Sequence, residues 1–127
     1  MILTKIVSLE EVDEPLELAD VPVPEPAADE LLVEVSACGV CHTELDEIEG
    51  RTAPPELPVI LGHEIVGRVV ETGKDVSRFS VGDRVGIGWI HSSCGGPREN
   101  ISDEFRATGR DANGGYAEFT TVSQDYA

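Results

Sequence analysis

The sequence is organised around residues 31–44, which read Leu31-Leu32-Val33-Glu34-Val35-Ser36-Ala37-Cys38-Gly39-Val40-Cys41-His42-Thr43-Glu44. In the first half of this stretch, apolar and polar side chains alternate, which is the pattern of a half-buried strand. The second half places a thiol next to an imidazole, at Cys41 and His42. We therefore predict a strand over Leu31 to Ala37 that leads into a group of chemically active side chains.

The other strong signals are also those of short strands. Segments rich in Val, Ile and aromatic residues are separated by turns that contain glycine or proline. Four further strands are predicted: Ile2 to Leu9, Ile65 to Glu71, Arg84 to Ile90 and Tyr116 to Val122. One short helix is predicted over Glu44 to Glu49, with Thr43 as its N-cap and Gly50 at its end. Short strands with little helix indicate a mainly β domain, either a barrel or a sandwich.

The length and charge of the chain limit its class. Its 127 residues are enough for one domain with a real core, which we expect to span residues 1–127. The 25 acidic residues outnumber the 9 basic ones and give a formal charge of -16, so we expect no nucleic acid and no anionic membrane as a partner. No apolar run is long enough for a membrane span, and the first residues lack the apolar core of a signal peptide.

The acidic excess and the cysteines bear on the environment of the protein. Acidic residues are spread along the whole sequence, which favours a halophilic protein whose charges are screened by salt; an ordinary acidic domain is the alternative. The three cysteines, Cys38, Cys41 and Cys94, leave one thiol over in any disulfide scheme. A reducing, cytoplasmic location is therefore expected.

A second motif, Leu61-Gly62-His63-Glu64, adds an imidazole and a carboxylate to the thiol of Cys41. Thiolate, imidazole and carboxylate are ligands of a catalytic zinc that keeps one position open. A cysteine can also be a small core residue, which is how we interpret Cys38. A redox pair of Cys38 and Cys41 is disfavoured because no strand-helix-strand pattern surrounds it.

Four motifs in register carry a resemblance to a known family: Gly39-Val40-Cys41-His42-Thr43, Gly62-His63-Glu64, Val81-Gly82-Asp83-Arg84-Val85 and Gly114-Gly115-Tyr116-Ala117-Glu118-Phe119. In this order and spacing they resemble the N-terminal GroES-like catalytic domain of zinc-dependent medium-chain alcohol dehydrogenases. The resemblance covers nearly the whole chain. It implies a partly open β-barrel with short helices and an oxidoreductase activity.

The resemblance also implies roles for single residues. Cys41 and His63 correspond to two ligands of a catalytic zinc, and Glu64 to a neighbouring or exchangeable ligand. Thr43 corresponds to the hydroxyl that relays the alcohol proton. His42 corresponds to a contact of the cofactor pyrophosphate. Trp89 lies where the family lines its substrate pocket, although core packing would explain this residue equally well.

Three departures from the family pattern stand out. Relatives hold a structural zinc on four cysteines in a lobe that would begin at Cys94, but the later positions carry residues such as Pro97, Asn100 and Ser102. One thiol cannot form a closed tetrahedral site, so we expect no structural zinc. Glu44 replaces an aspartate that orients the zinc histidine, and we expect its longer side chain to aim differently. Asp46 replaces a relay histidine.

The third departure is the end of the sequence at Ala127, before a third zinc ligand and a nucleotide-binding domain. No Gly-x-Gly-x-x-Gly follows a strand, so NAD(P) is expected only with a partner domain. We expect the domain to be inactive alone and to need a separate nucleotide-binding chain, or to self-associate through an uncovered interface. A non-catalytic zinc-binding or interaction module is the main alternative, and a co-chaperonin-like barrel is a weaker one.

Overall fold

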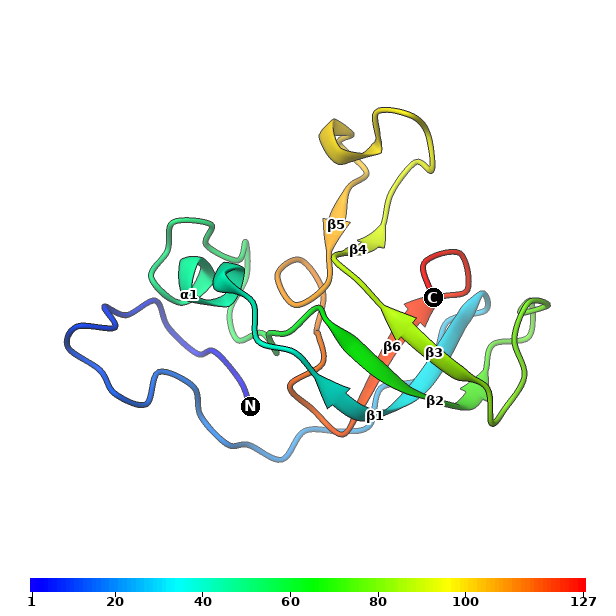
Figure 1. Ribbon diagram of the computed structural model, residues 1–127, viewed down its shortest axis with the longest axis horizontal. Helices are drawn as coiled ribbons and strands as arrows, with labels where there is room; N and C mark the ends of the chain where they lie inside the picture. Colours follow the sequence, from blue (N-terminus) through cyan, green and yellow to red (C-terminus); the bar gives the residue numbers. More distant parts are fainter.

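The computed structural model describes all 127 residues and is mainly β, as predicted (Figure 1). A curved sheet has the order β3-β2-β1-β6, and a second sheet pairs β4 with β5. The elements are β1 Glu30–Cys38, α1 His42–Ile48, β2 Ile65–Thr72, β3 Arg84–Ile87, β4 Ile90–Ser92, the 3-10 turn Glu99–Ile101, β5 Arg106–Ala107 and β6 Phe119–Ser123. No helix is long and apolar enough to span a bilayer.

Strand β1 is central because it pairs antiparallel with both β2 and β6. Its pairing with β2 shifts register between Leu32 and Val33 and again between Val35 and Ala37. Such irregularities bend a strand and increase its twist, which gives the sheet its curvature. Gly67 in β2 lies directly against the backbone of Glu34, where an added Cβ would collide. The sheet therefore curls toward a barrel while β3 and β6 remain its unpaired edges.

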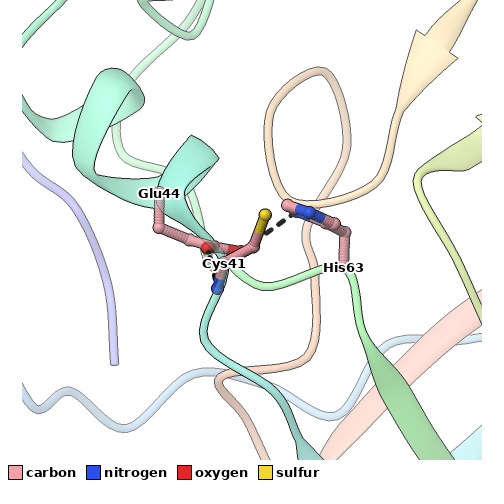
Figure 2. A group of neighbouring side chains, drawn as sticks. All are labelled: Cys41, Glu44 and His63. Atoms are coloured by element: carbon pink, nitrogen blue, oxygen red, sulfur yellow. Dashed lines mark hydrogen bonds and ion pairs between the residues drawn. The ribbon is translucent and has the colours of Figure 1, made fainter.

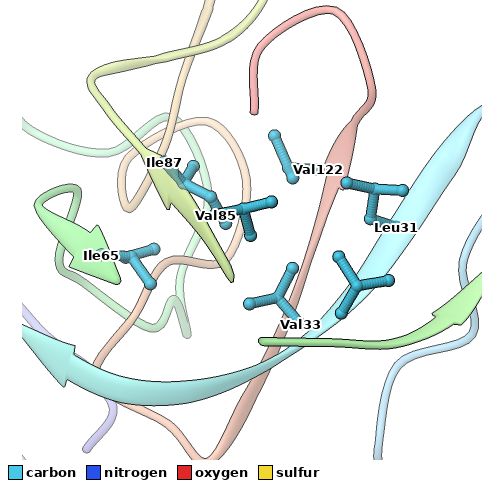
Figure 3. Packing of buried hydrophobic residues seen from close by; sticks show 7 residues of the cluster. Leu31, Val33, Ile65, Val85, Ile87 and Val122 are labelled. Atoms are coloured by element: carbon cyan, nitrogen blue, oxygen red, sulfur yellow. The ribbon is translucent and has the colours of Figure 1, made fainter. Parts of the chain in front are cut away.

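The concave side of this sheet holds the main hydrophobic core (Figure 3). Side chains from β1, β2, β3 and β6 point toward one another there: Leu31, Val33, Ile65, Val69, Val85, Ile87 and Val122. A second, smaller cluster packs Ile48 of α1 against Leu3, Val59 and Leu61. This second cluster fixes α1 beside the segment that leads into β2, and so sets the position of the motifs at residues 41–44 and 61–64.

The predicted strand over Ile2 to Leu9 is wrong. This segment makes only two isolated bridges, from Ile2 to Glu17 and from Leu3 to Val59. The chain opposite each bridge is interrupted by prolines, which lack the N–H that a ladder needs; they are Pro15, Pro54, Pro55 and Pro58. The segment is held instead by the burial of Leu3 in the second cluster.

Two other predicted strands have different bounds. The strand over Arg84 to Ile90 divides into β3 and β4, which belong to different sheets. The strand over Tyr116 to Val122 begins only at Phe119, because the N–H of Tyr116 donates to the carbonyl of Leu61 at 2.9 Å instead of to a neighbouring strand. The residues at which these strands begin and end depend on tertiary contacts that the local sequence does not show.

The helix is close to its prediction but has a different cap. Helix α1 covers His42–Ile48, with Cys41 rather than Thr43 at the N-cap position. The reason is Glu44, whose Oε2 accepts a hydrogen bond from the Cys41 N–H at 2.7 Å. A carboxylate at the third helical position that reaches back to the cap stabilises the first turn. The helix therefore starts two residues earlier than predicted, and Thr43 lies within its first turn.

Candidate metal centre

Helix α1 and the segment before β2 bring together the side chains that could hold a metal (Figure 2). Cys41 comes from the start of the helix, and His63 lies two residues before β2. One ligand atom each of Cys41, Glu44 and His63 lies within 4.8 Å of the others. His63 and Glu44 are buried, and Cys41 is half-buried. Two residues 22 positions apart thus form one compact thiolate and imidazole site.

Glu44 organises this site. Its Oε1 lies 3.0 Å from Nδ1 of His63, and its Oε2 holds the N–H of Cys41. The expectation that Glu44 would aim differently agrees with this geometry: the longer side chain bends back over the helix start and approaches the histidine at ion-pair distance, but without hydrogen-bond geometry. Neither Oε1 of Glu44 nor Nδ1 of His63 has a hydrogen-bond partner, so the contact places a negative charge beside the imidazole without fixing its tautomer. The donor set therefore fits a divalent zinc-like ion.

Thr43 and Trp89 flank the same site. The Oγ1 of Thr43 lies 3.5 Å from the Sγ of Cys41, so its hydroxyl is beside the candidate ligand sulfur. The indole of Trp89 meets the His63 ring edge to face, with centroids 4.8 Å apart and an interplanar angle of 75°. Phe105 lies next to Trp89 at a centroid distance of 6.4 Å. These rings give the site one apolar wall.

Glu64 is not brought into the group of ligand atoms. Its side chain is exposed and lies against Gly39, where an added Cβ would collide with the Glu64 carboxylate. The carbonyl of Glu64 also accepts a hydrogen bond from the Gly39 N–H at 2.9 Å. Consecutive residues of an extended chain point to opposite sides, so His63 faces the site while Glu64 faces away from its ligand atoms.

His42 and Asp46 lie on the outer side of α1. The His42 side chain is 78% exposed, and its Nε2 is 3.8 Å from Oδ1 of Asp46. The same Oδ1 accepts a short hydrogen bond of 2.5 Å from Nε of Arg51. Asp46 is thus already paired with a cation.

The two cysteines outside the site differ from each other. Cys38 packs against the main core, and burial raises the pKa of its thiol. Cys94 is exposed in the loop after β4, and the pKa of its thiol is lowered, chiefly by a hydrogen bond from the backbone of Gly96. Cys38 thus behaves as the core residue that the sequence indicated.

Sequence reasoning missed Glu47. Its side chain is fully buried, and neither carboxyl oxygen has a hydrogen-bond partner. Burial, followed by the nearby charge of Glu44, raises the pKa of Glu47 to about 8. A signal was present in the sequence, because Glu44, Glu47 and the core residue Ile48 share one helical face at spacings of three and four.

Comparisons with known proteins agree with this geometry. The model of the alcohol dehydrogenase GroES-like domain family matches residues 27–127. An alcohol dehydrogenase of Mycobacterium tuberculosis, AdhA, is 48% identical over 124 residues, which are 89% of this chain and 36% of the relative. An alcohol dehydrogenase of Geobacillus stearothermophilus is 39% identical over 96% of this chain and 38% of its own length.

A solved NAD-dependent alcohol dehydrogenase superposes with a TM-score of 0.86 at 30% identity, covering 98% of this chain and 37% of the solved chain. The chain therefore spans little more than a third of the length of the relatives it matches. The predicted fold, a GroES-like partly open barrel, is confirmed. By sequence and by fold, the chain belongs to the family of alcohol dehydrogenase GroES-like domains.

Proposed function

We propose that this chain is the zinc-binding catalytic half of an NAD(P)-linked alcohol dehydrogenase. The observation that carries the proposal is the group formed by Cys41, Glu44 and His63, in which one carboxylate holds both candidate ligands in place. A sulfur and an imidazole nitrogen are a donor set suited to zinc, and the Glu44 carboxylate lies 3.0 Å from the imidazole.

The residues around this group suit the removal of a proton from an alcohol. Zinc, when bound, supplies the positive charge that favours the ionised form of the alcohol. The hydroxyl of Thr43, next to Cys41, would accept the hydroxyl proton of the substrate and pass it outward. The rings of Trp89 and Phe105 would exclude water and contact an apolar substrate group.

The nicotinamide cofactor would come with a second domain. In support, a zinc-binding dehydrogenase of Sinorhizobium meliloti, 37% identical over 84% of this chain with a TM-score of 0.76, was solved with NADP. His42, which is largely exposed at the start of α1, is available to meet a pyrophosphate carried by such a domain. That domain would be a separate chain or further sequence of the same protein.

One observation favours a second candidate, a zinc-binding module without catalysis. Asp46, which stands where relatives carry a relay histidine, is paired with Arg51. Cys41, Glu44 and His63 form the single group of side chains that could hold a metal ion. A site with two or three protein ligands and water could bind zinc without turning over an alcohol. Glu64 would join the ligands in this case only after its side chain turned toward His63.

The experiment that separates these functions begins with zinc content. The chain, purified in high salt, should bind one Zn²⁺, and both Cys41→Ser and His63→Ala should lose it; exposed Cys94→Ser is the matched control. Oxidation of primary and secondary alcohols is then followed with NAD⁺ or NADP⁺, with and without an extract of the source cells. Activity that requires the extract supports the catalytic half. Zinc binding without activity in either case supports the module, and absence of zinc from the wild type would falsify both.

The proposal extends to the environment of the protein. The charge of -16 and the three free thiols fit a halophilic, cytoplasmic protein. If the protein is halophilic, its unfolding free energy should rise with salt concentration. If it is cytoplasmic, all three cysteines should be free thiols after isolation.

A further inference from the structure

Glu47 is a buried acidic group without an assigned role. Its side chain is 0% exposed, and both oxygens lack a hydrogen-bond partner. Leaving a carboxylate in this state is strongly unfavourable unless a positive charge lies nearby. Near neutral pH the carboxyl is therefore either held in its protonated form or placed where it can gain a cation.

Arg110 is the only basic side chain that acts on Glu47, and its attraction is smaller than the repulsion of Glu44. Arg110 is also engaged elsewhere: its Nη1 is 3.3 Å from the Asp111 carboxylate and its Nε donates to the carbonyl of Thr52 at 3.3 Å. The other charged groups that act on Glu47 are acidic: Glu44 and Asp46 on α1, and Asp111 itself. Three acidic neighbours and one engaged arginine leave the Glu47 carboxylate without a counterion.

The metal centre is the remaining source of positive charge. Glu47 follows Glu44 by three residues on the same buried face of α1, and Glu44 contacts His63. Residues at this spacing are neighbours on the helix surface, with Cβ atoms about 5–6 Å apart. In a buried setting, where the effective dielectric constant is low, a divalent ion at Cys41 and His63 would act strongly on Glu47.

We propose that Glu47 is a positioning residue of the metal centre, whose buried negative charge strengthens the binding of a divalent cation by Cys41 and His63. The inference rests on the metal centre of the proposed function. It adds a second carboxylate behind Glu44, one that makes no contact with the metal. The cation in turn relieves the unfavourable burial of Glu47, so the two stabilise each other.

The test uses the full chain and Co²⁺, whose visible spectrum reports its ligands, at pH 8.5 so that Glu47 is largely ionised. Glu47→Gln keeps the shape of the side chain and removes the charge. It should weaken Co²⁺ binding by at least about tenfold, as loss of a carboxylate behind a metal ligand commonly does. The thiolate absorption of the bound Co²⁺ should be unchanged, because Cys41 and His63 are intact.

Three further variants make the result specific. Glu49→Gln removes the same charge from the residue that follows α1, where Glu49 pairs with Arg51, and should leave the affinity within about twofold. Glu47→Leu, which fills the space without a polar group, should bind Co²⁺ as weakly as Glu47→Gln. Glu47→Asp should recover part of the affinity because it restores the charge.

The outcomes separate a failure of the metal centre from a failure of the role of Glu47. If the wild-type chain binds no Co²⁺ or Zn²⁺, both the metal centre and the role of Glu47 are wrong. If the wild type binds and Glu47→Gln binds equally well, or if Glu49→Gln loses as much as Glu47→Gln, the metal centre stands and the role of Glu47 is overturned.

Discussion

The interior of the sheet and the interior beneath α1 are built from different kinds of residue. The sheet buries a cluster that is entirely aliphatic, from β1, β2, β3 and β6. Beneath α1, the buried side chains include Glu44, Glu47 and His63 alongside the aliphatic cluster around Ile48. The first interior lowers the free energy of the fold by burying apolar surface. The second retains ionisable groups at an energetic cost, which is typical of a functional site.

The largest effect that this comparison predicts comes from breaking the sheet interior. Ile65, 2% exposed at the start of β2, packs in the main cluster. Ile65→Ala should lower the unfolding free energy by about 4 kcal/mol, because it removes buried methyl groups and leaves a cavity. Urea denaturation followed by far-UV circular dichroism measures this loss. Val81→Ala, at a side chain that is 65% exposed, should change it by less than about 0.5 kcal/mol.

The interior beneath α1 should show the opposite behaviour, in that removing a charge stabilises it. In the folded, metal-free chain the pKa of Glu47 is about 8, compared with the ordinary 4.5. A carboxyl whose pKa is raised by folding binds its proton more tightly in the native state. Its contribution to stability is therefore full below pH 4.5 and is lost as the pH rises to about 8.

Glu47→Gln should abolish this loss. At pH 8.5, without metal and with a chelator present, the variant should be more stable than the wild type by about 3 kcal/mol, and at pH 4 the two should be nearly equal. Thermal unfolding at a series of pH values measures the difference. If the stabilities of the wild type and the variant change in parallel from pH 4 to pH 9, Glu47 is not held protonated by its surroundings.

The difference between the two interiors also explains what could be predicted from the sequence. The strands around Val33 and Ile65 were predictable because alternation of apolar and polar residues is a local signal. The pairing of Cys41 with His63 was predictable only through the family motifs, since 22 positions separate them. The predicted strand over Ile2 to Leu9 failed because prolines in the opposite segments prevented a ladder, and those partners are distant in sequence.

The exact aim of Glu44 and the burial of Glu47 could not be read from the sequence for a different reason. The aim of the Glu44 side chain depends on the start of the helix, where Cys41 takes the cap position, and this geometry is set by a hydrogen bond. The burial of Glu47 depends on the packing of α1 against Leu3 and Leu61. For Glu47, an acidic residue suggests a solvent-facing position, and the tertiary structure overrides that expectation.

A smaller effect concerns the contact between Glu44 and His63. Glu44→Ala should weaken Zn²⁺ binding by about 10- to 100-fold, because His63 loses its orientation and Cys41 loses the acceptor of its N–H. Isothermal titration calorimetry measures the affinity, and Glu44→Asp should bind more tightly than Glu44→Ala. An unchanged affinity in Glu44→Ala would mean that the helix start holds the ligands without this carboxylate.

The smallest predicted effect comes from a surface substitution. It involves neither the sheet interior nor the interior beneath α1, and so serves as a reference for both. Residues 10–14 carry four exposed acidic side chains, at Glu10, Glu11, Asp13 and Glu14. Glu11→Gln should raise the unfolding free energy by no more than about 0.5 kcal/mol in 0.05 M KCl, because it relieves repulsion. In 1 M KCl, where charges are screened beyond about 3 Å, the gain should vanish. The loss in Ile65→Ala, which arises from packing, should be nearly the same at both salt concentrations. If the gain in Glu11→Gln persists in 1 M KCl, it does not arise from surface repulsion, and residues 10–14 no longer support a halophilic protein.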